Sequence, residues 1–355
     1  EVIDAFTSSE VNGFSYIEVK VSRYRNARSL KRIFNWFAFS WRLLRLNYFI
    51  NDRPDYILYS SPSLIPYLGA YYLSRKFKVP LIWDIRDLWP LTLMKLGGMT
   101  KYNIFVVVHK LIELFAYKNS DYIVSNWPYA NRYLEGLGNK KLKFLFLPNG
   151  YMEEEFDNPK MLDQYVKDQI PKEKFIVGYA GTLGKANAVN VIAEVALALR
   201  QNTEVHIVLV GDGDGVSYLN DYIKDHNLLN ITIINSIEKL QIPSLLSNFD
   251  VCYVGFNKSD LYEYGSSLNK LPEYLMSGNP IIFSIDSPFK PVFEASCGFH
   301  VAAEDVDGIV TAIFELKSMT LSERKILGLN GKSYAVKNYR YAHLSQKLVN
   351  FLEEQ

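Results

Sequence analysis

The sequence has few cysteines, almost no net charge and no long apolar segment, and each scarcity excludes a class of protein. Its 355 residues include two cysteines, Cys252 and Cys297, both in apolar surroundings, so we expect neither a disulfide framework nor a zinc site. The net charge of +1 gives no general reason to expect a nucleic-acid partner. No uninterrupted run reaches the roughly 18 apolar residues of a membrane-spanning helix. The scarcity of cysteine suits a reducing cytoplasm.

The length predicts two domains, because a single hydrophobic core rarely grows beyond about 250–300 residues. An apolar content of 48% and a charged content of 22% are ordinary for a folded soluble protein. We expect the first domain to span residues 1–155 and the second to span residues 156–337. A closing amphipathic segment within 338–355 could pack on either domain.

The most informative segment runs from Tyr264 to Ile282 and combines a polar loop, a helix start and a strand. Asn269 is a good N-cap residue, and Pro272 fits the first turn of the helix that follows. Lys270 adds a full charge to a helix N-terminus, which already attracts anions. Glu273 lies one turn further along. Because a diphosphate would fit at the lysine and ribose hydroxyls at the glutamate, the segment predicts a nucleotide-sugar site.

Apolar runs alternate with amphipathic segments along the whole chain. In the first half, the predicted strands are 15–21, 56–59, 80–83, 121–124 and 143–146. In the second half, they are 175–180, 204–210, 230–234, 250–254, 280–283 and 298–302. Helical patterns separate most of them, and the acidic stretch 152–157 is typical of a linker. This alternation predicts an α/β protein with two doubly wound parallel-sheet domains and a cleft between them.

Five short motifs, in order, indicate a family. They are WDIRDLWP at 83–90, FLPNG at 146–150, YAGTLG at 179–184, VGDG at 210–213, and the stretch from Asn269 to Pro280. Together they resemble a GT-B glycosyltransferase of the large retaining family 4. The chain is most similar to the bacterial branch that builds O-antigen and capsule, such as L-fucosamine transferases. The resemblance implies a GT-B fold: two Rossmann-like domains, the first binding the acceptor and the second the nucleotide sugar.

The same resemblance bears on how the chain begins. Members normally start with a strand, a glycine-containing loop and a helix before a segment like Glu1-Val2-Ile3. We therefore expect this first strand–loop–helix unit to be absent from the sequence given.

The resemblance assigns roles around the donor. Lys270 would stabilise the negative charge of the departing nucleoside diphosphate, and Glu273 would hold the ribose hydroxyls. Backbone amides of the loop from Gly181 to Gly184 would approach phosphate, with Lys185 and Asn187 as further candidates. The remaining residues expected near the donor are Thr182, Gly211, Gly213, Ser266, Ser267, Leu268 and Asn269.

The sequence departs from the family at Gly265, where many relatives carry a glutamate. This leaves the contacts to the transferred sugar open. Asp212-Gly213-Asp214 has the spacing of a metal–diphosphate site in another transferase fold, but the resembled family needs no metal here. We expect a turn with acidic caps, no metal, and no cofactor besides the UDP-sugar substrate. None of the five histidines has metal-ligand spacing.

Asp84, Arg86 and Asp87 follow a predicted strand of the first domain. The resemblance places them at the cleft, near the acceptor. The triplet could orient an acceptor hydroxyl, with either aspartate in direct contact, or it could be an internal ion pair that ties the loop.

The segment from 30 to 48 is helical in pattern and apolar on two sides. We expect one stripe in the core: Leu30, Ile33, Phe34, Phe37, Trp41, Leu44 and Tyr48. A second stripe with flanking basic residues could contact acceptor or membrane: Arg32, Trp36, Phe39, Arg42, Leu43 and Leu46. Such a helix is either buried on both sides or lies in a bilayer surface.

These observations lead us to expect retaining transfer of a hexose or N-acetylated amino sugar from a UDP-sugar. The acceptor would be a hydroxyl of a polyprenyl-diphosphate-linked glycan, at the inner face of the cytoplasmic membrane. Two alternatives stay open: a non-hydrolysing nucleotide-sugar epimerase and a non-catalytic sugar-nucleotide-binding relative.

Overall fold

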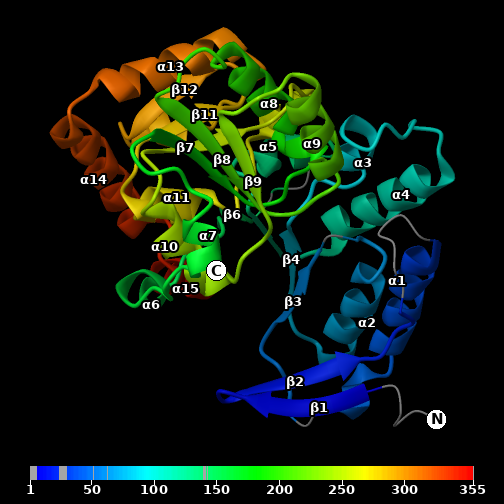
Figure 1. The fold of residues 1–355 in the computed structure, drawn as a ribbon. Coiled ribbons are helices and arrows are strands. Elements are labelled where there is room, and N and C mark those ends of the chain that lie inside the picture. Colours follow the sequence, from blue (N-terminus) through cyan, green and yellow to red (C-terminus); the bar gives the residue numbers. More distant parts are fainter. Residues whose placement is uncertain are drawn as a thin grey trace. The chain divides into compact units, whose positions relative to one another are not determined.

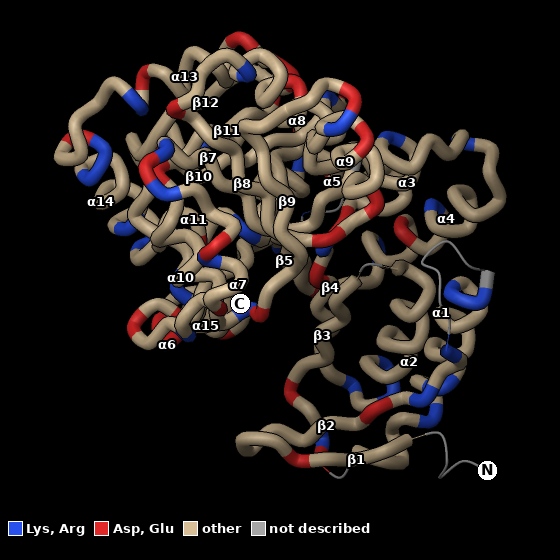
Figure 2. The backbone as a smooth tube through the Cα atoms, viewed as in Figure 1, with Lys and Arg blue, Asp and Glu red and all other residues tan. Residues whose placement is uncertain are grey.

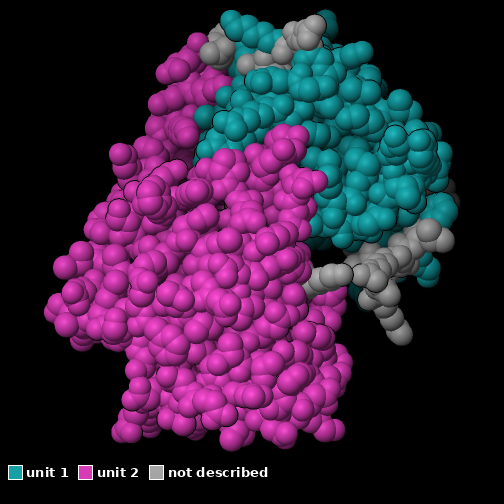
Figure 3. All heavy atoms as spheres, turned by 90° about the horizontal axis from the view of Figure 1, so that it is seen from above, with its two compact units in different colours: residues 1–147 teal, residues 148–355 magenta. Residues whose placement is uncertain are grey.

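The computed structural model describes residues 6–23, 30–50, 52–61, 63–138, 141 and 143–354, so the expectation about Glu1-Val2-Ile3 falls outside the described residues. The chain divides into two compact units, Glu1–Leu147 and Pro148–Gln355 (Figures 1 and 3). The sequence pattern placed the domain boundary later, after residue 155. The predicted linker is instead mostly helix α6, Glu153–Asp157, because its three glutamates fill a first turn, where negative charge is favourable.

Unit 1 contains a parallel sheet of four strands in the order β3-β4-β5-β6. The strands are β3 (Ile57–Ser60), β4 (Leu81–Ile85), β5 (Tyr122–Ser125) and β6 (Phe144–Phe146). The helices are α1 (Leu30–Leu43), α2 (Tyr67–Phe77), α3 (Leu91–Lys95), α4 (Ile104–Asn119) and α5 (Ala130–Glu135). Every residue of β4 and β5 is buried, which explains the apolar runs at 81–83 and 122–124 in the sequence.

The predicted strand 15–21 belongs to a hairpin and not to this sheet. Strand β2 (Phe14–Val19) pairs antiparallel with β1 (Phe6–Val11). Asn12 and Gly13 join them and both have positive φ, 52° and 79°, as tight hairpin turns require. The Asn-Gly pair is the sequence signal that the parallel-sheet interpretation overlooked.

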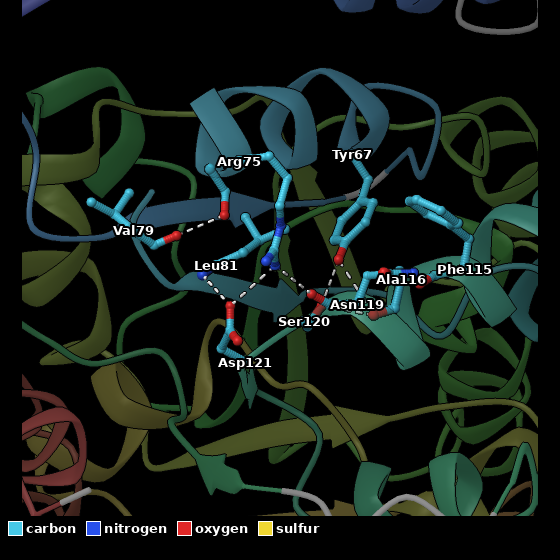
Figure 4. A network of polar contacts seen from close by, with 10 residues as sticks. Tyr67, Arg75, Val79, Leu81, Phe115, Ala116, Asn119, Ser120 and Asp121 are labelled. Carbon is cyan, nitrogen blue, oxygen red and sulfur yellow. Dashed lines mark hydrogen bonds and ion pairs between the residues drawn. The ribbon is translucent and has the colours of Figure 1, made fainter. Parts of the chain in front are cut away.

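A polar network fixes the amino ends of β4 and β5 (Figure 4). The Asp121 carboxylate accepts a 2.9 Å hydrogen bond from the Leu81 amide and lies 3.6 Å from the Arg75 guanidinium. The Tyr67 hydroxyl lies 2.8 Å from the Ser120 hydroxyl. These contacts hold helices α2 and α4 to the sheet at the amino ends of its strands. The predicted acidic triplet lies at the opposite, carboxyl end of β4.

Unit 2 contains a parallel sheet of six strands in the order β12-β11-β10-β7-β8-β9. The strands are β7 (Phe175–Ala180), β8 (Val205–Val210), β9 (Ile231–Ile234), β10 (Val251–Gly255), β11 (Ile281–Ser284) and β12 (Gly298–Val301). The helices after α6 are α7 (Gln164–Lys167), α8 (Val189–Ala198), α9 (Val216–Asp225), α10 (Ile242–Leu246), α11 (Leu271–Ser277), α12 (Pro291–Glu294), α13 (Val306–Ser318), α14 (Leu321–Asn338) and α15 (Tyr341–Glu353). Helices α8 and α13 share one apolar core with the sheet, and α11 packs against α14 (Figure 1).

The closing helix α15 belongs to unit 2. Arg340, just before it, forms an isolated bridge with Tyr151 and an ion pair with Glu153 of α6. The Tyr151 amide also donates to the Tyr339 carbonyl over 3.0 Å. The start of unit 2 is therefore joined to its end.

Candidate functional site

A pocket of about 470 Å³ opens where strands β7 and β10 of unit 2 end. These strands are neighbours at the point where the strand order reverses, which is where open α/β sheets bind ligands. Eight of the residues predicted around the donor line it: Gly181, Thr182, Asn187, Ser267, Leu268, Asn269, Lys270 and Glu273. Five residues that sequence reasoning missed complete the wall: Ala180, Ile237, Lys239, Ile242 and Phe256.

Lys270 is held in this pocket by two neutral side chains. Its ammonium donates hydrogen bonds to the Tyr179 hydroxyl over 2.9 Å and to Asn187 Oδ1 over 3.0 Å. It also lies 4.5 Å from the centre of the Tyr179 ring. Burial lowers the pKa of Lys270 to about 8. In the described part of the chain this ammonium has no acidic partner, so its charge is available to an anionic ligand.

Helix α11 starts one residue later than the sequence suggested. Lys270 is the N-cap residue, with no side-chain cap, and Pro272 lies in the first turn as predicted. Asn269 is therefore not the cap; its exposed side chain bonds to that of Asn149. Because α11 has seven residues, its dipole is weak, and the Lys270 side chain supplies most of the positive charge.

Tyr274 fixes α11 to the end of β7. Its buried hydroxyl accepts a hydrogen bond from the Ala180 amide over 2.6 Å and donates one to the Ala180 carbonyl over 3.0 Å. The lysine at the start of α11 is thereby placed beside the loop that follows β7.

Two glycines let the loops after β7 and β8 touch. Gly181 and Gly211 both have φ of 148°, and a Cβ on Gly211 would lie 1.9 Å from the Gly181 carbonyl oxygen. The Gly181 amide donates to Val210 and the Leu183 amide donates to Asp212, each over 2.9 Å. These two amides are engaged within the protein, which corrects the expectation that Gly181 offers its amide to phosphate.

The other loop candidates have different surroundings. Gly184 is buried outside the pocket lining, and the place of its missing Cβ is 3.0 Å from the Asp214 carboxylate. Gly213 supports the loop, since its Cβ would lie 2.3 Å from the Leu183 carbonyl oxygen. Neither Gly211 nor Gly213 lines the pocket, and the side chain of Lys185 lies outside the described residues.

Glu273 is 13% exposed and forms an ion pair with Lys239 of the short helix η4, Lys239–Gln241. The same ammonium lies 3.9 Å from the Glu155 carboxylate. No sequence motif indicates Lys239, because only the fold brings η4 next to α11.

The loop before α11 explains the departure at Gly265. This residue has φ of 92° and ψ of −164°, a conformation essentially restricted to glycine, so a glutamate there would need a different backbone. The next residue, Ser266, is 2% exposed, and its hydroxyl has no hydrogen-bond partner among the described residues. Ser267 and Leu268 follow in the pocket wall.

In unit 1, the acidic triplet lies where β4 ends. Asp84 accepts a 2.7 Å hydrogen bond from the Ser60 hydroxyl and lies 3.7 Å from the Arg86 guanidinium, both on Oδ2. Its buried Oδ1 has no partner in the described chain. Burial raises the pKa of Asp84, and Ser60 and Arg86 oppose that rise; burial also raises the pKa of Asp87.

The two stripes of α1 are reversed relative to the prediction. Trp36 packs against Trp89 and Phe105, with ring centres 5.5 and 5.9 Å away. The Arg32 guanidinium lies over the Trp36 ring, while Phe39 and Arg42 are half-buried and Leu43 is buried. The predicted core stripe is instead largely exposed: Phe34, Phe37, Trp41 and Tyr48. The side chain of Leu30 is outside the described residues.

The Asp212–Asp214 turn has no metal-site geometry. Asp212 accepts a hydrogen bond from Ser236, and Asp214 lines a second pocket, of about 370 Å³, with Asn190 and Tyr218. Gly215, not an aspartate, is the N-cap residue of α9. Among the described residues, no three His, Cys, Asp or Glu side chains are grouped to hold a metal ion.

None of the described helices is both long and apolar enough to span a membrane.

Comparison with models of known protein families identifies the part of the chain that contains the pocket. Residues 163–334 match the family model described as Glycosyl transferases group 1. The chain therefore carries a glycosyltransferase domain, which confirms the predicted enzyme class at this level. No curated protein matches the chain by sequence.

Solved structures share the fold at low sequence identity. Sucrose-phosphate synthase from Thermosynechococcus elongatus has a TM-score of 0.76 at 15% identity, covering 99% of this chain and 85% of that one. Anabaena HepE, in complex with UDP and glucose, has a TM-score of 0.69 at 13% identity, covering 89% and 81%. An E. coli structure described as trehalose-6-phosphate bound with UDP-2-fluoro glucose has a TM-score of 0.73 at 12% identity, covering 99% and 89%. These likenesses confirm the predicted GT-B fold with two Rossmann-like domains.

Proposed function

We propose that this chain, with its group 1 glycosyltransferase domain, is a retaining transferase for a hexose or N-acetylated amino sugar. The donor is a UDP-sugar, and the acceptor is a hydroxyl of a polyprenyl-diphosphate-linked glycan in surface polysaccharide biosynthesis. One observation carries the proposal: the Lys270 ammonium, which has no acidic partner in the described chain, and the Glu273 carboxylate line one pocket of that domain. A nucleotide sugar needs a cation for its diphosphate and an acceptor for its ribose hydroxyls.

Lys270 supplies the electrostatic part of the reaction. When the glycosidic bond to the donor breaks, negative charge develops on the diphosphate, and a fixed ammonium nearby stabilises it. Tyr179 and Asn187 hold that ammonium without neutralising it. The diphosphate in turn raises the pKa of Lys270, so the lysine is protonated when the charge develops.

Glu273 selects the nucleoside. An ionised carboxylate accepts hydrogen bonds from two vicinal hydroxyls, which only a ribose with both hydroxyls supplies. The apolar side chains of Ile237 and Ile242 in the same pocket offer a surface for the base. That HepE and the E. coli structure hold UDP or a UDP-sugar supports uridine as this base.

For the acceptor, we propose Asp84 of unit 1. Its buried Oδ1 has no partner among the described residues, and Arg86 and Ser60 hold Oδ2. Oδ1 is therefore suited to accept a hydrogen bond from an acceptor hydroxyl. Asp84→Asn should lower the transfer rate and leave UDP affinity unchanged. If Asp84 only forms an internal ion pair with Arg86, the variant will lose stability and keep its transfer rate per folded molecule.

The exposed face of α1 supports contact with a membrane. Phe34, Phe37 and Trp41 lie on it, with Trp41 64% exposed. Eight basic and no acidic residues occur between Glu18 and Asp52, and Figure 2 shows Lys and Arg along α1. Exposed aromatic rings and positive charge suit an anionic bilayer, where a lipid-linked acceptor is found.

Vesicle sedimentation tests this contact. We expect binding to phosphatidylglycerol vesicles at low salt, weaker binding at high salt, and loss of binding in Phe37→Ser/Trp41→Ser. Equal recovery of this variant and the unaltered protein with vesicles would remove membrane contact from the proposal.

A panel of nucleotides and nucleotide sugars, tested by thermal shift, is the main test of the function. UDP-sugars should raise the melting temperature, and the best donor is then incubated with and without a lipid-linked acceptor. Isomerised sugar nucleotide in the absence of acceptor would indicate an epimerase instead. Donor binding without transfer to any of a range of acceptors would favour the non-catalytic alternative.

A further inference from the structure

The same pocket contains a second lysine, Lys239, that the predicted donor contacts do not include. Its ammonium pairs with Oε1 of Glu273 and lies 3.9 Å from Oε2 of Glu155. Lys239 is 58% exposed, whereas the Glu273 side chain is 13% exposed. The lysine therefore reaches from the pocket rim to a carboxylate deeper in its wall.

The base of Lys239 is firmly held. The side chain of Gln241, in the same helical turn, is buried and donates to the Met161 carbonyl over 2.9 Å. The backbone amide of Gln241 donates a hydrogen bond to the Glu238 carbonyl over 2.9 Å. The backbone of η4 is anchored in this way, and the Lys239 ammonium contacts the carboxylates of both Glu155 and Glu273.

A carboxylate has two oxygens and can bind a cation and a diol at once. Lys239 engages Oε1 of Glu273, and Oε2 has no partner among the described residues. Without the lysine, two half-buried carboxylates would lie close together, and their repulsion would turn Glu273 from its present position.

We infer that Lys239 is a positioning residue for ribose recognition: it holds Glu273 by one oxygen and leaves the other for the ribose hydroxyls. This inference rests on the proposed function, since it concerns the nucleotide half of the donor. It predicts that Lys239 affects ribose recognition and leaves diphosphate recognition, which belongs to Lys270, unchanged.

Calorimetric titration with three ligands separates these roles: UDP, 2′,3′-dideoxyuridine diphosphate, which lacks the diol, and inorganic pyrophosphate. The unaltered protein should bind UDP about 10-fold or more tightly than the dideoxy analogue, the effect of a hydrogen bond to a charged group. In Lys239→Met this preference should shrink to about 2-fold, because Glu273 is no longer held. Pyrophosphate should bind both proteins equally, which also reports an intact fold.

Two further variants complete the design. Lys239→Arg keeps a cation at the site and should restore most of the ribose preference. Lys317→Met removes another Lys–Glu pair of unit 2, with Glu204, that shares no residue with the pocket, and should behave like the unaltered protein.

The outcomes distinguish the two proposals. If Lys239→Met keeps the full preference for UDP, or binds UDP more tightly, Lys239 does not position Glu273 and the inference is overturned. If the unaltered protein does not distinguish UDP from its dideoxy analogue, or does not bind UDP, the proposed function itself fails and the inference with it.

Discussion

The Lys270 ammonium donates a 3.0 Å hydrogen bond to the Asn187 side chain and so joins the start of α11 to the loop between β7 and α8. Its other acceptor, the Tyr179 hydroxyl, is also neutral. The lysine is therefore oriented by two contacts that leave its charge uncompensated. This arrangement is costly for the free protein and favourable once a diphosphate is present.

Replacing Lys270 should separate catalysis from stability. In Lys270→Ala we expect kcat/KM for sugar transfer to fall about 10²- to 10³-fold, the effect of removing one stabilising group from a charged transition state. The melting temperature should stay near that of the unaltered protein, because a desolvated ammonium without an acidic partner contributes little to folding. Lys317→Met serves as the control. Near-normal turnover in Lys270→Ala would exclude Lys270 from the active site.

The affinity for UDP should depend on pH around the pKa of Lys270, about 8 in the free protein. A bound diphosphate raises this pKa, so above pH 8 the complex holds more protons than its free components, and binding takes up a proton. Affinity should therefore fall as pH rises from 8 to 9.5, by up to about 10-fold per pH unit. The terminal phosphate of UDP ionises near pH 6, so its charge does not change between pH 8 and 9.5.

Calorimetry in two buffers of different ionisation heat at pH 9 measures this proton uptake directly. Lys270→Met should show none. An affinity that is constant from pH 7.5 to 9.5 would contradict the assignment of Lys270 to the diphosphate.

A side chain at position 181 should disturb the pocket. In Gly181→Ala the new Cβ would lie 2.9 Å from Lys270 Cε, and the φ of 148° is unfavourable for alanine. We expect a stability loss of about 1–3 kcal/mol and weaker UDP binding. Gly98→Ala is the matched control, since Gly98 also has positive φ, 66°, but open space around it. It should lose stability and keep its UDP affinity; weakened UDP binding in both variants would argue against a specific clash at Lys270.

Removal of the Tyr274 hydroxyl should destabilise unit 2. Tyr274→Phe leaves the buried amide and carbonyl of Ala180 without these hydrogen bonds, at a cost of about 1–3 kcal/mol. Urea unfolding followed by circular dichroism measures the loss. Tyr165→Phe, at a residue that is 72% exposed, should change nothing. Equal stability of the two variants would show that Tyr274 does not hold α11 to β7.

Most strands of the parallel sheets were predictable because burial makes them largely apolar. The run 175–180 coincides with β7, and 298–302 differs from β12 by one residue. The strand predicted at 15–21 corresponds to β2, but its partner β1 was missed, because β1 is mostly exposed and lacks such a run. Its only clear signal was the Asn-Gly turn.

The orientation of α1 could not be predicted from helical periodicity. The sequence has an aromatic residue on each face, Trp36 and Trp41, and periodicity alone does not say which face is packed. Trp89 and Phe105, more than fifty residues away in sequence, provide the partners of Trp36. Which stripe is buried is thus decided by distant segments of the chain.

The residues of the candidate site also differ in whether the sequence alone could identify them. Lys270 and Glu273 lie in one short motif and could be found in the sequence, whereas Lys239 comes from a segment without a motif. The role of Gly181 in phosphate binding was misjudged because the sequence does not reveal that its amide already bonds to Val210.

The backbone contact between Gly181 and Gly211 has a consequence for how the pocket can be altered. No side chain separates the two loops: one added at Gly211 would force the loops apart, and one added at Gly181 would meet Lys270, so substitution at either glycine disrupts the pocket instead of tuning its shape. Variation in donor preference, by natural drift or by engineering, must then come from the positions that surround this contact. Thr182 and Ser267, which line the pocket and are at least partly accessible, are where a library of variants should begin.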